Sequence, residues 1–188
     1  MGRLQFSKRY ADRVARLRVP SGFVLVAVFA WFARPTAQSL AFGVAVGLPG
    51  IALRAWAAGC LSKNEKLATG GPYAYTRNPL YLGTLLTAAG LAVASRSLGL
   101  GALFAAVFLF VYLPVIQLEE QHLRSLFPGY ASYADQVPAI WPRLKPAGQT
   151  SSHCFRFALY LKNQEYNAAF GFAAGVLFLA WKCGWQPK

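Results

Sequence analysis

The sequence predicts an all-α integral membrane protein, with about five transmembrane helices folded as one domain over residues 1–188. Hydrophobic residues make up 56% of the chain, and its mean hydropathy is +0.36. Charged residues make up only 13%, whereas soluble domains carry roughly 25%. Several uncharged stretches also approach the roughly 20 residues that a helix needs to cross a bilayer. These three observations exclude an ordinary soluble domain.

The first two helices are expected over residues 19–33 and 37–59. The basic segment 1–18 precedes the first apolar run, and a basic segment followed by an apolar run is also the pattern of a signal peptide. Because the basic part is long and no clean cleavage site precedes the next charged turn, we expect a retained helix. Arg54 lies near the end of the second run, where a snorkelling side chain explains it.

The remaining helices are expected over residues 79–95, 98–118 and 168–181, the last within a C-terminal helix at 165–183. The turn Ser-Arg-Ser between the third and fourth is so short that these two form an antiparallel hairpin. GxxxG spacing lets helices approach closely and could support a homodimer. It occurs in the second and the last helix, at Gly43 and Gly47 and at Gly171 and Gly175.

The charge distribution predicts the orientation. With a cytoplasmic N-terminus and five alternating helices, 15 of the 19 Lys and Arg residues fall inside and 4 outside, as the positive-inside rule requires. This orientation places the polar segments 60–78 and 119–166 together on the cytoplasmic face.

The net charge of +13 follows from the same rule and attracts anionic membrane lipids. No nucleic-acid-binding motif appears, so we expect no nucleic-acid partner. The three cysteines lack CxxC spacing and predict neither a disulfide framework nor a zinc site, and we expect no metal. They are Cys60, Cys154 and Cys183.

The first polar segment contains "GPYAYTRNPLYLG", which is unusually rigid. Gly70-Gly71 permits uncommon backbone angles, and Pro72 fixes φ. Pro79 moves Asn78 out of the helical region, so a helix begins at Pro79. Such a loop holds polar groups in fixed positions at the membrane surface, where it could line a cavity. The alternative is an interfacial aromatic belt formed by Tyr73, Tyr75 and Tyr81.

The second polar segment begins with Glu119 and Glu120, two of only six acidic residues. Acidic residues are unfavourable at a helix C-terminus, an objection that weakens if the helix continues past Glu120. A carboxylate here could bind a ribose diol or an ammonium group, although an ordinary helix end is the alternative. We interpret His122 as an exposed helix residue rather than a base.

Together, "GPYAYTRNPLYLG", the hairpin, the Glu pair and "LFPGYASYADQVP" resemble the isoprenylcysteine carboxyl methyltransferase family and the wider membrane phospholipid methyltransferases. The family pattern is roughly G-x-Y-x-x-x-R-H-P-x-Y-x-G, then E-E, then F-G-x-x-Y-x-x-Y-x-x-x-V-P. Both halves occur in order here, over a motif-bearing catalytic core at about residues 60–142.

The resemblance implies a methyltransferase dependent on S-adenosylmethionine that acts on a lipophilic or isoprenoid substrate at the cytoplasmic membrane face. Its cofactor pocket would be formed by the loop before the third helix and the segment after the fourth. The implied catalytic residues are Arg77, Asn78 and Glu120. The implied cofactor-binding residues are Glu65, Lys66, Leu67, Ala68, Tyr73, Asn78, Pro79, Leu80, Tyr81, Glu119 and Glu120. Arg77 and Arg143 would stabilise the loops or an anionic head.

Three positions depart from the family pattern. Asn78 replaces the motif histidine and cannot titrate near neutrality. Glu65 stands where eukaryotic members have a second histidine. Val115 stands where an isoprenylcysteine enzyme is expected to hold the substrate carboxylate, which weakens the case for that acceptor. The acceptor therefore stays open among lipid amines, isoprenoid thiols or carboxylates and other apolar molecules.

Two other functions are consistent with the sequence. Membrane sterol reductases resemble this fold in their C-terminal half and use NADPH, but they are much longer. A small membrane scaffold or lipid-binding protein, dimerising through GxxxG faces, would bind neither cofactor and has no need of a rigid Pro-Tyr-Arg loop near a Glu pair.

Overall fold

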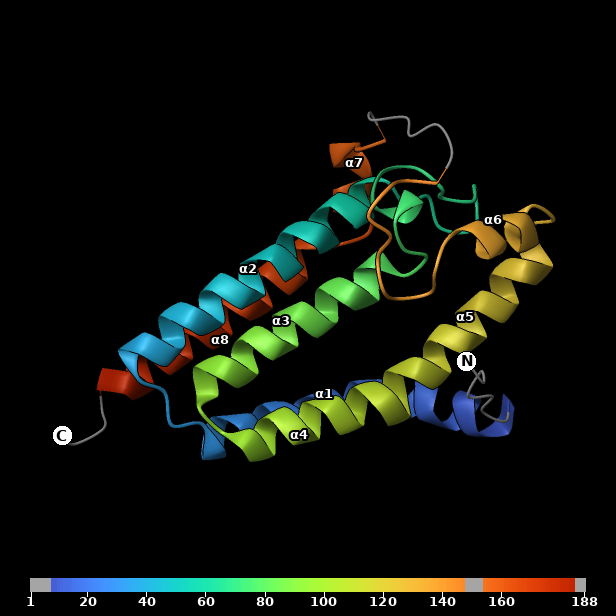
Figure 1. The fold of residues 1–188 in the computed structure, drawn as a ribbon. Coiled ribbons are helices and arrows are strands. Elements are labelled where there is room, and N and C mark those ends of the chain that lie inside the picture. The colour runs from blue at the N-terminus through green and yellow to red at the C-terminus, as the bar shows by residue number, and fades with distance from the viewer. Residues whose placement is uncertain (1–7, 148–153, 185–188) are drawn as a thin grey trace.

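The computed structural model describes residues 8–147 and 154–184, which form helices and loops with no strand. Helices α2, α3 and α8 lie side by side, and α1 packs across the long helix made by α4 and α5 (Figure 1). Over the described residues, the predicted all-α fold is confirmed. The elements are α1 (Lys8–Phe32), α2 (Ala37–Gly59), η1 (Gly71–Ala74), α3 (Pro79–Ser95), α4 (Leu98–Val107), η2 (Phe108–Tyr112), α5 (Leu113–Leu126), α6 (Tyr130–Gln136), α7 (Phe157–Lys162) and α8 (Tyr166–Gly184).

Local sequence signals set the ends of α2 and α3. The Thr36 hydroxyl accepts a hydrogen bond from the Ser39 N–H at 3.2 Å, and the Ser39 hydroxyl accepts one from the Thr36 N–H at 2.9 Å. Pro79 begins α3, because its fixed φ suits the first helical position. Arg96, with φ 51°, then turns the chain into α4. The predicted boundaries at 37–59 and 79–95, and the hairpin, are confirmed.

The fourth predicted helix continues beyond its expected end at residue 118. α4, the π-helical turn η2 and α5 run without a break over Leu98–Leu126. Pro114 explains the π turn, because it cannot donate to the carbonyl of Phe110 and its ring crowds that carbonyl. Since the helix extends past Glu120, neither carboxylate of the Glu pair lies at a helix C-terminus.

Glycines bring α2 and α3 into close contact. A Cβ on Gly43 would lie 2.5 Å from the Cβ of Ala94, and a Cβ on Gly50 would lie 2.6 Å from the carbonyl oxygen of Gly83. The predicted GxxxG face of α2 is therefore used within the chain. On α8, by contrast, a Cβ on Gly171 would meet nothing within 4 Å.

Within residues 8–147 and 154–184, three helices are long and apolar enough to cross a membrane: Ala37–Gly59, Leu98–Leu126 and Tyr166–Gly184. The apolar helices Gly22–Phe32 and Pro79–Ser95 are shorter. Large apolar side chains lie exposed on several of these helices, as expected for surfaces that face lipid rather than water. The structure supports a membrane protein, while the count of five spans stays a prediction.

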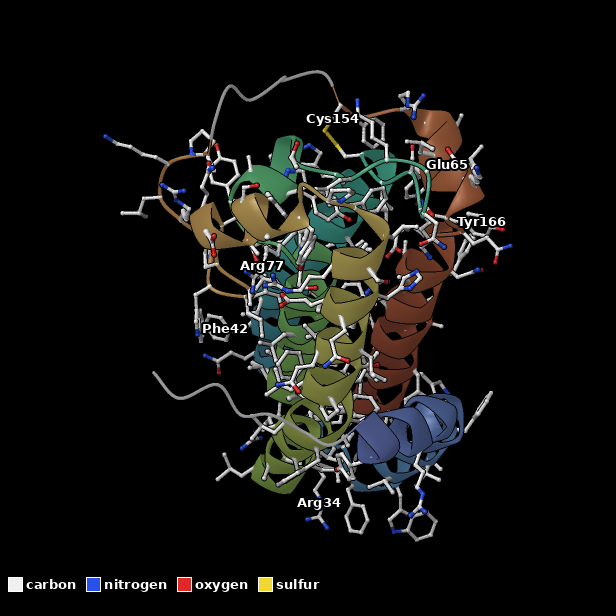
Figure 2. All side chains as sticks on the ribbon, turned by 90° about the vertical axis from the view of Figure 1, so that its right-hand side faces the viewer. Arg34, Phe42, Glu65, Arg77, Cys154 and Tyr166 are labelled. Carbon is white, nitrogen blue, oxygen red and sulfur yellow. A yellow bond between two sulfur atoms is a disulfide. The ribbon has the colours of Figure 1, made fainter. Side chains whose placement is uncertain are left out.

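The cysteine prediction is wrong. Cys60, at the end of α2, forms a disulfide with Cys154, 94 residues later (Figure 2). Spacing rules detect cysteines that are near in sequence, so they could not reveal a pair that only the fold brings together. The bond ties the segment before α7 to the end of α2, beside the first polar segment.

Candidate functional site

The two polar segments meet at the start of α3. The Arg77 N–H donates to the carbonyl of Pro138 at 2.9 Å, and the Arg143 N–H donates to the carbonyl of Tyr75 at 3.0 Å. The exposed Arg143 guanidinium bonds to the carbonyl of Gln136. The rigid loop before α3 is thus held from its other side by the chain that follows α6.

Gly71 allows the loop to begin against the disulfide. Its φ of +57° lies in the left-handed region, where side chains are strained. A Cβ at this position would also lie 3.0 Å from the sulfur of Cys60 and 3.2 Å from the indole nitrogen of Trp56. No other residue type fits here without moving the loop.

Arg77, Asn78 and Glu120 form one hydrogen-bonded group. Arg77 Nε and Nη2 donate to the two carboxylate oxygens of Glu120 at 2.9 and 3.2 Å, and Nη1 donates to the carbonyl of Ala134 at 2.7 Å. The Asn78 amide donates to Glu120 at 3.3 Å and to the carbonyl of Ala139 at 3.0 Å. The bidentate ion pair therefore joins α5 to the start of α3.

A pocket of about 720 Å³ lies beside this group, within the size range of small-molecule sites. Its walls come from the loop at 61–68, the first turns of α3, the helix α5 and the connection at 163–165 before α8. Most of the residues carried over from the family resemblance line it. They are Lys66, Leu67, Ala68, Tyr73, Arg77, Asn78, Pro79, Leu80, Tyr81 and Glu119.

Two residues of that set lie outside the lining. Glu120 stands behind the wall and holds Arg77 and Asn78. Glu65 points to solvent and bonds to Lys162 at 2.7 Å (Figure 2). The hydrogen bond and charge of Lys162 lower the pKa of the Glu65 carboxyl. Its contact therefore links the loop at 61–68 to α7.

Three tyrosines line the pocket together: Tyr73 and Tyr130 are buried, and Tyr133 is half-buried. The Tyr133 hydroxyl donates to the carbonyl of Tyr73 at 2.7 Å, and the Tyr133 ring meets Tyr130 edge-on with centroids 6.0 Å apart. The Arg124 guanidinium lies 5.3 Å from the Tyr130 ring centroid. Burial raises the pKa of Tyr130 to about 12 and also raises the pKa of Tyr73 and of Tyr133. All three hydroxyls are thus neutral donors near neutral pH.

The Tyr130 hydroxyl is buried, and no described residue forms a hydrogen bond with it. The charge of Glu120 and its close approach to this hydroxyl both help to raise the pKa of Tyr130, but the two groups do not reach the geometry of a full hydrogen bond. A buried hydroxyl without a partner costs about 1–3 kcal/mol. Tyr130 lines the pocket with other atoms, while its hydroxyl is enclosed by protein.

Sequence reasoning missed part of the lining, including Arg54, Thr84, Glu165 and Tyr130. The snorkelling interpretation of Arg54 is wrong. Its Nε bonds to the carboxylate of Glu165 and its Nη1 to the hydroxyl of Thr84. One signal in the sequence could have indicated this pair. Acidic residues are scarce, and Glu165 directly precedes an apolar helix, where a carboxylate needs a basic partner.

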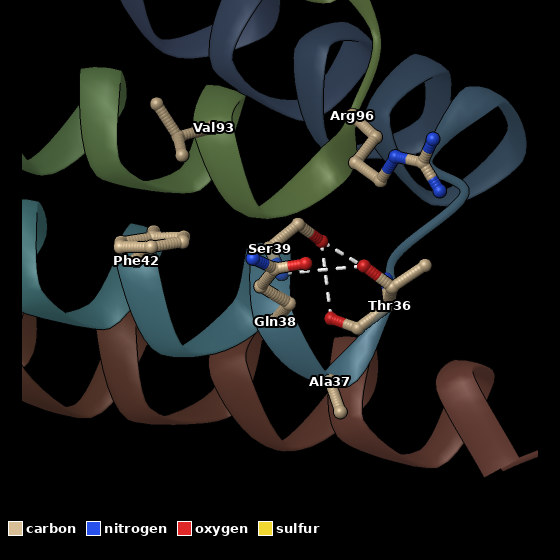
Figure 3. A pocket seen from close by; sticks show the side chains of 7 residues that line it. All are labelled: Thr36, Ala37, Gln38, Ser39, Phe42, Val93 and Arg96. Atoms are coloured by element: carbon tan, nitrogen blue, oxygen red, sulfur yellow. Dashed lines mark hydrogen bonds between the residues drawn. The ribbon is translucent and has the colours of Figure 1, made fainter.

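A second hollow, of about 530 Å³, lies at the other end of α2 and is shown in Figure 3. Its polar side chains already serve the helix cap, since the Ser39 hydroxyl bonds to Thr36 and donates to the carbonyl of Ala94 at 3.0 Å. Arg96, on its rim, is exposed. None of the residues carried over from the family resemblance lies there.

The chain is similar to two curated proteins. The chain is 41% identical over 105 residues to the cobalt-zinc-cadmium resistance protein CzcN of Cupriavidus metallidurans, covering 53% of this chain and 49% of that protein. It is 32% identical over 124 residues to the nickel-cobalt-cadmium resistance protein NccN of Alcaligenes xylosoxydans xylosoxydans, covering 63% of this chain and 58% of that protein. The chain thus spans about half the length of these curated relatives.

No solved structure matches the chain. A family model described as phospholipid methyltransferase matches residues 18–129, from within α1 to the end of α5 and the turn after it. This stretch covers more than half of the 188 residues and includes the rigid loop and the Glu pair. The chain therefore belongs to the phospholipid methyltransferase family.

Proposed function

We propose that this protein transfers a methyl group from S-adenosylmethionine to a lipophilic substrate at the membrane surface. The observation that carries the proposal is the shared pocket. Residues from two segments that lie about 40 positions apart, such as Asn78 and Glu119, line the same cavity. Family membership supports methyl transfer as the reaction.

The residues present fit this cofactor. The exposed carboxylate of Glu119 suits a ribose diol or an ammonium group, and Lys66 suits a carboxylate. When bound, S-adenosylmethionine supplies a methyl group already activated on a sulfonium.

The protein's own contribution is then to position two reactants and exclude water. Arg77 and Glu120 act as a positioning pair, because their bonds fix the wall of the pocket between α3 and α5. Asn78 also positions, since both protons of its amide are donated to Glu120 and Ala139. A side chain held in this way does not take a proton from the acceptor.

The acceptor is proposed to enter from the bilayer. α5 leads away from α3 toward α6 (Figure 1), and the pocket is lined there by Tyr81, Tyr112 and Ala168 from three apolar helices. Val115 is only 7% exposed and is not part of the lining, which argues against a substrate carboxylate at that position.

The remaining membrane arrangement is part of this proposal, with five spans and the N-terminus and pocket on the cytoplasmic face. Since disulfides are rare in the reducing cytoplasm, Cys60 and Cys154 would be thiols in the cell and bonded after oxidation. Trapping thiols in intact cells with a membrane-permeant maleimide tests this directly. A pair that is fully oxidised in the cell would contradict the proposed orientation.

The names of the two relatives concern resistance to cobalt, zinc, cadmium and nickel. Among the described residues, no group of three or more His, Cys, Asp or Glu side chains is placed to hold a metal ion. We therefore propose methylation of a membrane component, rather than metal binding, as this chain's contribution to any such resistance.

Calorimetry on detergent-purified protein tests the proposal, with S-adenosylhomocysteine and NADPH titrated in parallel. Saturable binding of S-adenosylhomocysteine alone is expected. Binding of NADPH alone would indicate a reductase, and binding of neither, also after reconstitution in lipid, would leave the scaffold function.

A further inference from the structure

The pocket contains an ion pair that does not belong to the proposed cofactor-binding residues. Arg54 of α2 bonds through Nε to Glu165 and through Nη1 to the Thr84 hydroxyl and, at 3.3 Å, to the carbonyl of Leu80. The side chains of Arg54 and Glu165 are 22% and 9% exposed. Both line the pocket, as does Thr84.

The packing of α2 against α3 leaves space for the Arg54 side chain. A Cβ on Gly83 would lie 2.5 Å from Cγ of Arg54, so only glycine lets the arginine cross α3 at this level. Gly50, one turn earlier on α2, brings the two backbones together. Partly buried ion pairs gain little stability, because desolvation offsets their attraction. The arrangement is therefore better explained by recognition than by stability.

Each partner keeps unused hydrogen-bonding capacity. None of the described residues bonds to Nη2 of Arg54 or to Oε2 of Glu165. Neither atom is fully buried, since the Tyr130 hydroxyl is the buried unpartnered side-chain atom of the described residues. The pair thus offers a small molecule two donors and one acceptor, held side by side.

The pair also lies next to the apolar helices. Thr84 is more than one turn into the apolar helix α3, and Glu165 directly precedes the apolar helix α8. Lys66, by contrast, belongs to the loop at 61–68, whereas Glu165 is the last charged residue before α8. A lipophilic molecule from the bilayer would therefore reach Arg54 and Glu165 with its polar head.

We propose that Arg54 and Glu165 form a subsite for the polar head of the lipophilic methyl acceptor. This head is uncharged and carries a hydrogen-bond donor beside a hydrogen-bond acceptor. This inference rests on the proposed function. The hydrogen-bond acceptor of the head would accept a hydrogen bond from Nη2–H of Arg54, and the hydrogen-bond donor of the head would donate to Oε2 of Glu165. Glu165 repels a carboxylate or phosphate and Arg54 repels an ammonium, so the neutral pair selects against charged heads.

Decanamide and decanoate test the selection, because they share chain and shape but differ in charge and in having a donor. Their binding is measured by saturation-transfer NMR on the protein in lipid nanodiscs, with empty nanodiscs as the blank. The wild-type protein should prefer decanamide by about tenfold, the usual effect of one charged group left wrongly paired. Glu165→Gln leaves a net positive site, so the preference should move toward decanoate.

S-adenosylhomocysteine affinity, measured on the same samples, separates this inference from the proposed function. If the wild-type protein does not bind S-adenosylhomocysteine, the proposed function is refuted. Normal binding with equal affinity for the two probes, or with a preference that Glu165→Gln does not change, would overturn the subsite alone. If the Glu165→Gln variant no longer binds S-adenosylhomocysteine, the preference between the two probes is measured on the Thr84→Val variant instead. That variant loosens Arg54 and should reduce the preference for decanamide, and an unchanged preference would refute the subsite.

Discussion

Replacing Tyr130 by phenylalanine should stabilise the ligand-free protein. The substitution removes a buried hydroxyl that bonds to no described residue, and such a group costs about 1–3 kcal/mol. The void left by one oxygen offsets part of this gain. We therefore expect the ligand-free protein to gain about 1 kcal/mol, which corresponds to a rise in Tm of roughly 2–4 °C for a chain of this size.

Tyr133→Phe is the matched control, three residues away on the same helix. Its hydroxyl donates to the carbonyl of Tyr73 at 2.7 Å, so its removal leaves that carbonyl unpaired and should lower stability by about 1–2 kcal/mol. Thermal unfolding in detergent, followed by circular dichroism, measures both variants.

The reasoning about Tyr130 would be refuted if Tyr130→Phe lowered the Tm of the ligand-free protein as much as Tyr133→Phe does. That result would mean that the hydroxyl already has a partner, of which Glu120 is the nearest candidate.

Three further predictions concern the cofactor, the helix packing and pH. Glu119→Gln should weaken S-adenosylhomocysteine binding about tenfold, whereas Glu65→Gln, an equal charge change outside the lining, should leave the calorimetric Kd unchanged. Gly43→Ala should destabilise by about 1–3 kcal/mol because its Cβ meets α3, whereas Gly171→Ala, in open space, should be neutral or stabilising in thermal unfolding. Burial raises the pKa of Tyr130 to about 12, while an unfolded tyrosine titrates near 10. The unfolded chain therefore loses its protons first, so stability should hold below about pH 10 and fall as the pH rises toward 12. A Tm that does not fall over that range would contradict the burial of the Tyr130 hydroxyl.

The sequence allowed prediction of the elements that have local signals. The cap at Thr36 and the proline at position 79 fix helix ends within a few residues, so the boundaries at 37–59 and 79–95 agree with the structure. The rigid loop and Glu119 could be placed in one pocket because family motifs carry them. Even there, Glu65 and Glu120 lie outside the lining, since a motif does not show which way a side chain points.

The remaining features depend on long-range contacts. The Cys60–Cys154 disulfide joins residues 94 positions apart, and the Arg54–Glu165 pair joins residues 111 positions apart. Both depend on where the segment after α6 returns to the end of α2, and no local pattern indicates this path. The unpartnered hydroxyl of Tyr130 likewise results from packing around it, which a motif containing that tyrosine cannot reveal.

The central claim is that two separate polar segments form one cofactor pocket. Ultraviolet crosslinking of radiolabelled S-adenosylmethionine to the purified protein, followed by peptide mapping, tests it most directly. We predict label, displaced by S-adenosylhomocysteine, on peptides from both residues 61–81 and residues 119–133. Label confined to the hollow around Thr36 and Arg96, or none that S-adenosylhomocysteine displaces, would contradict the claim.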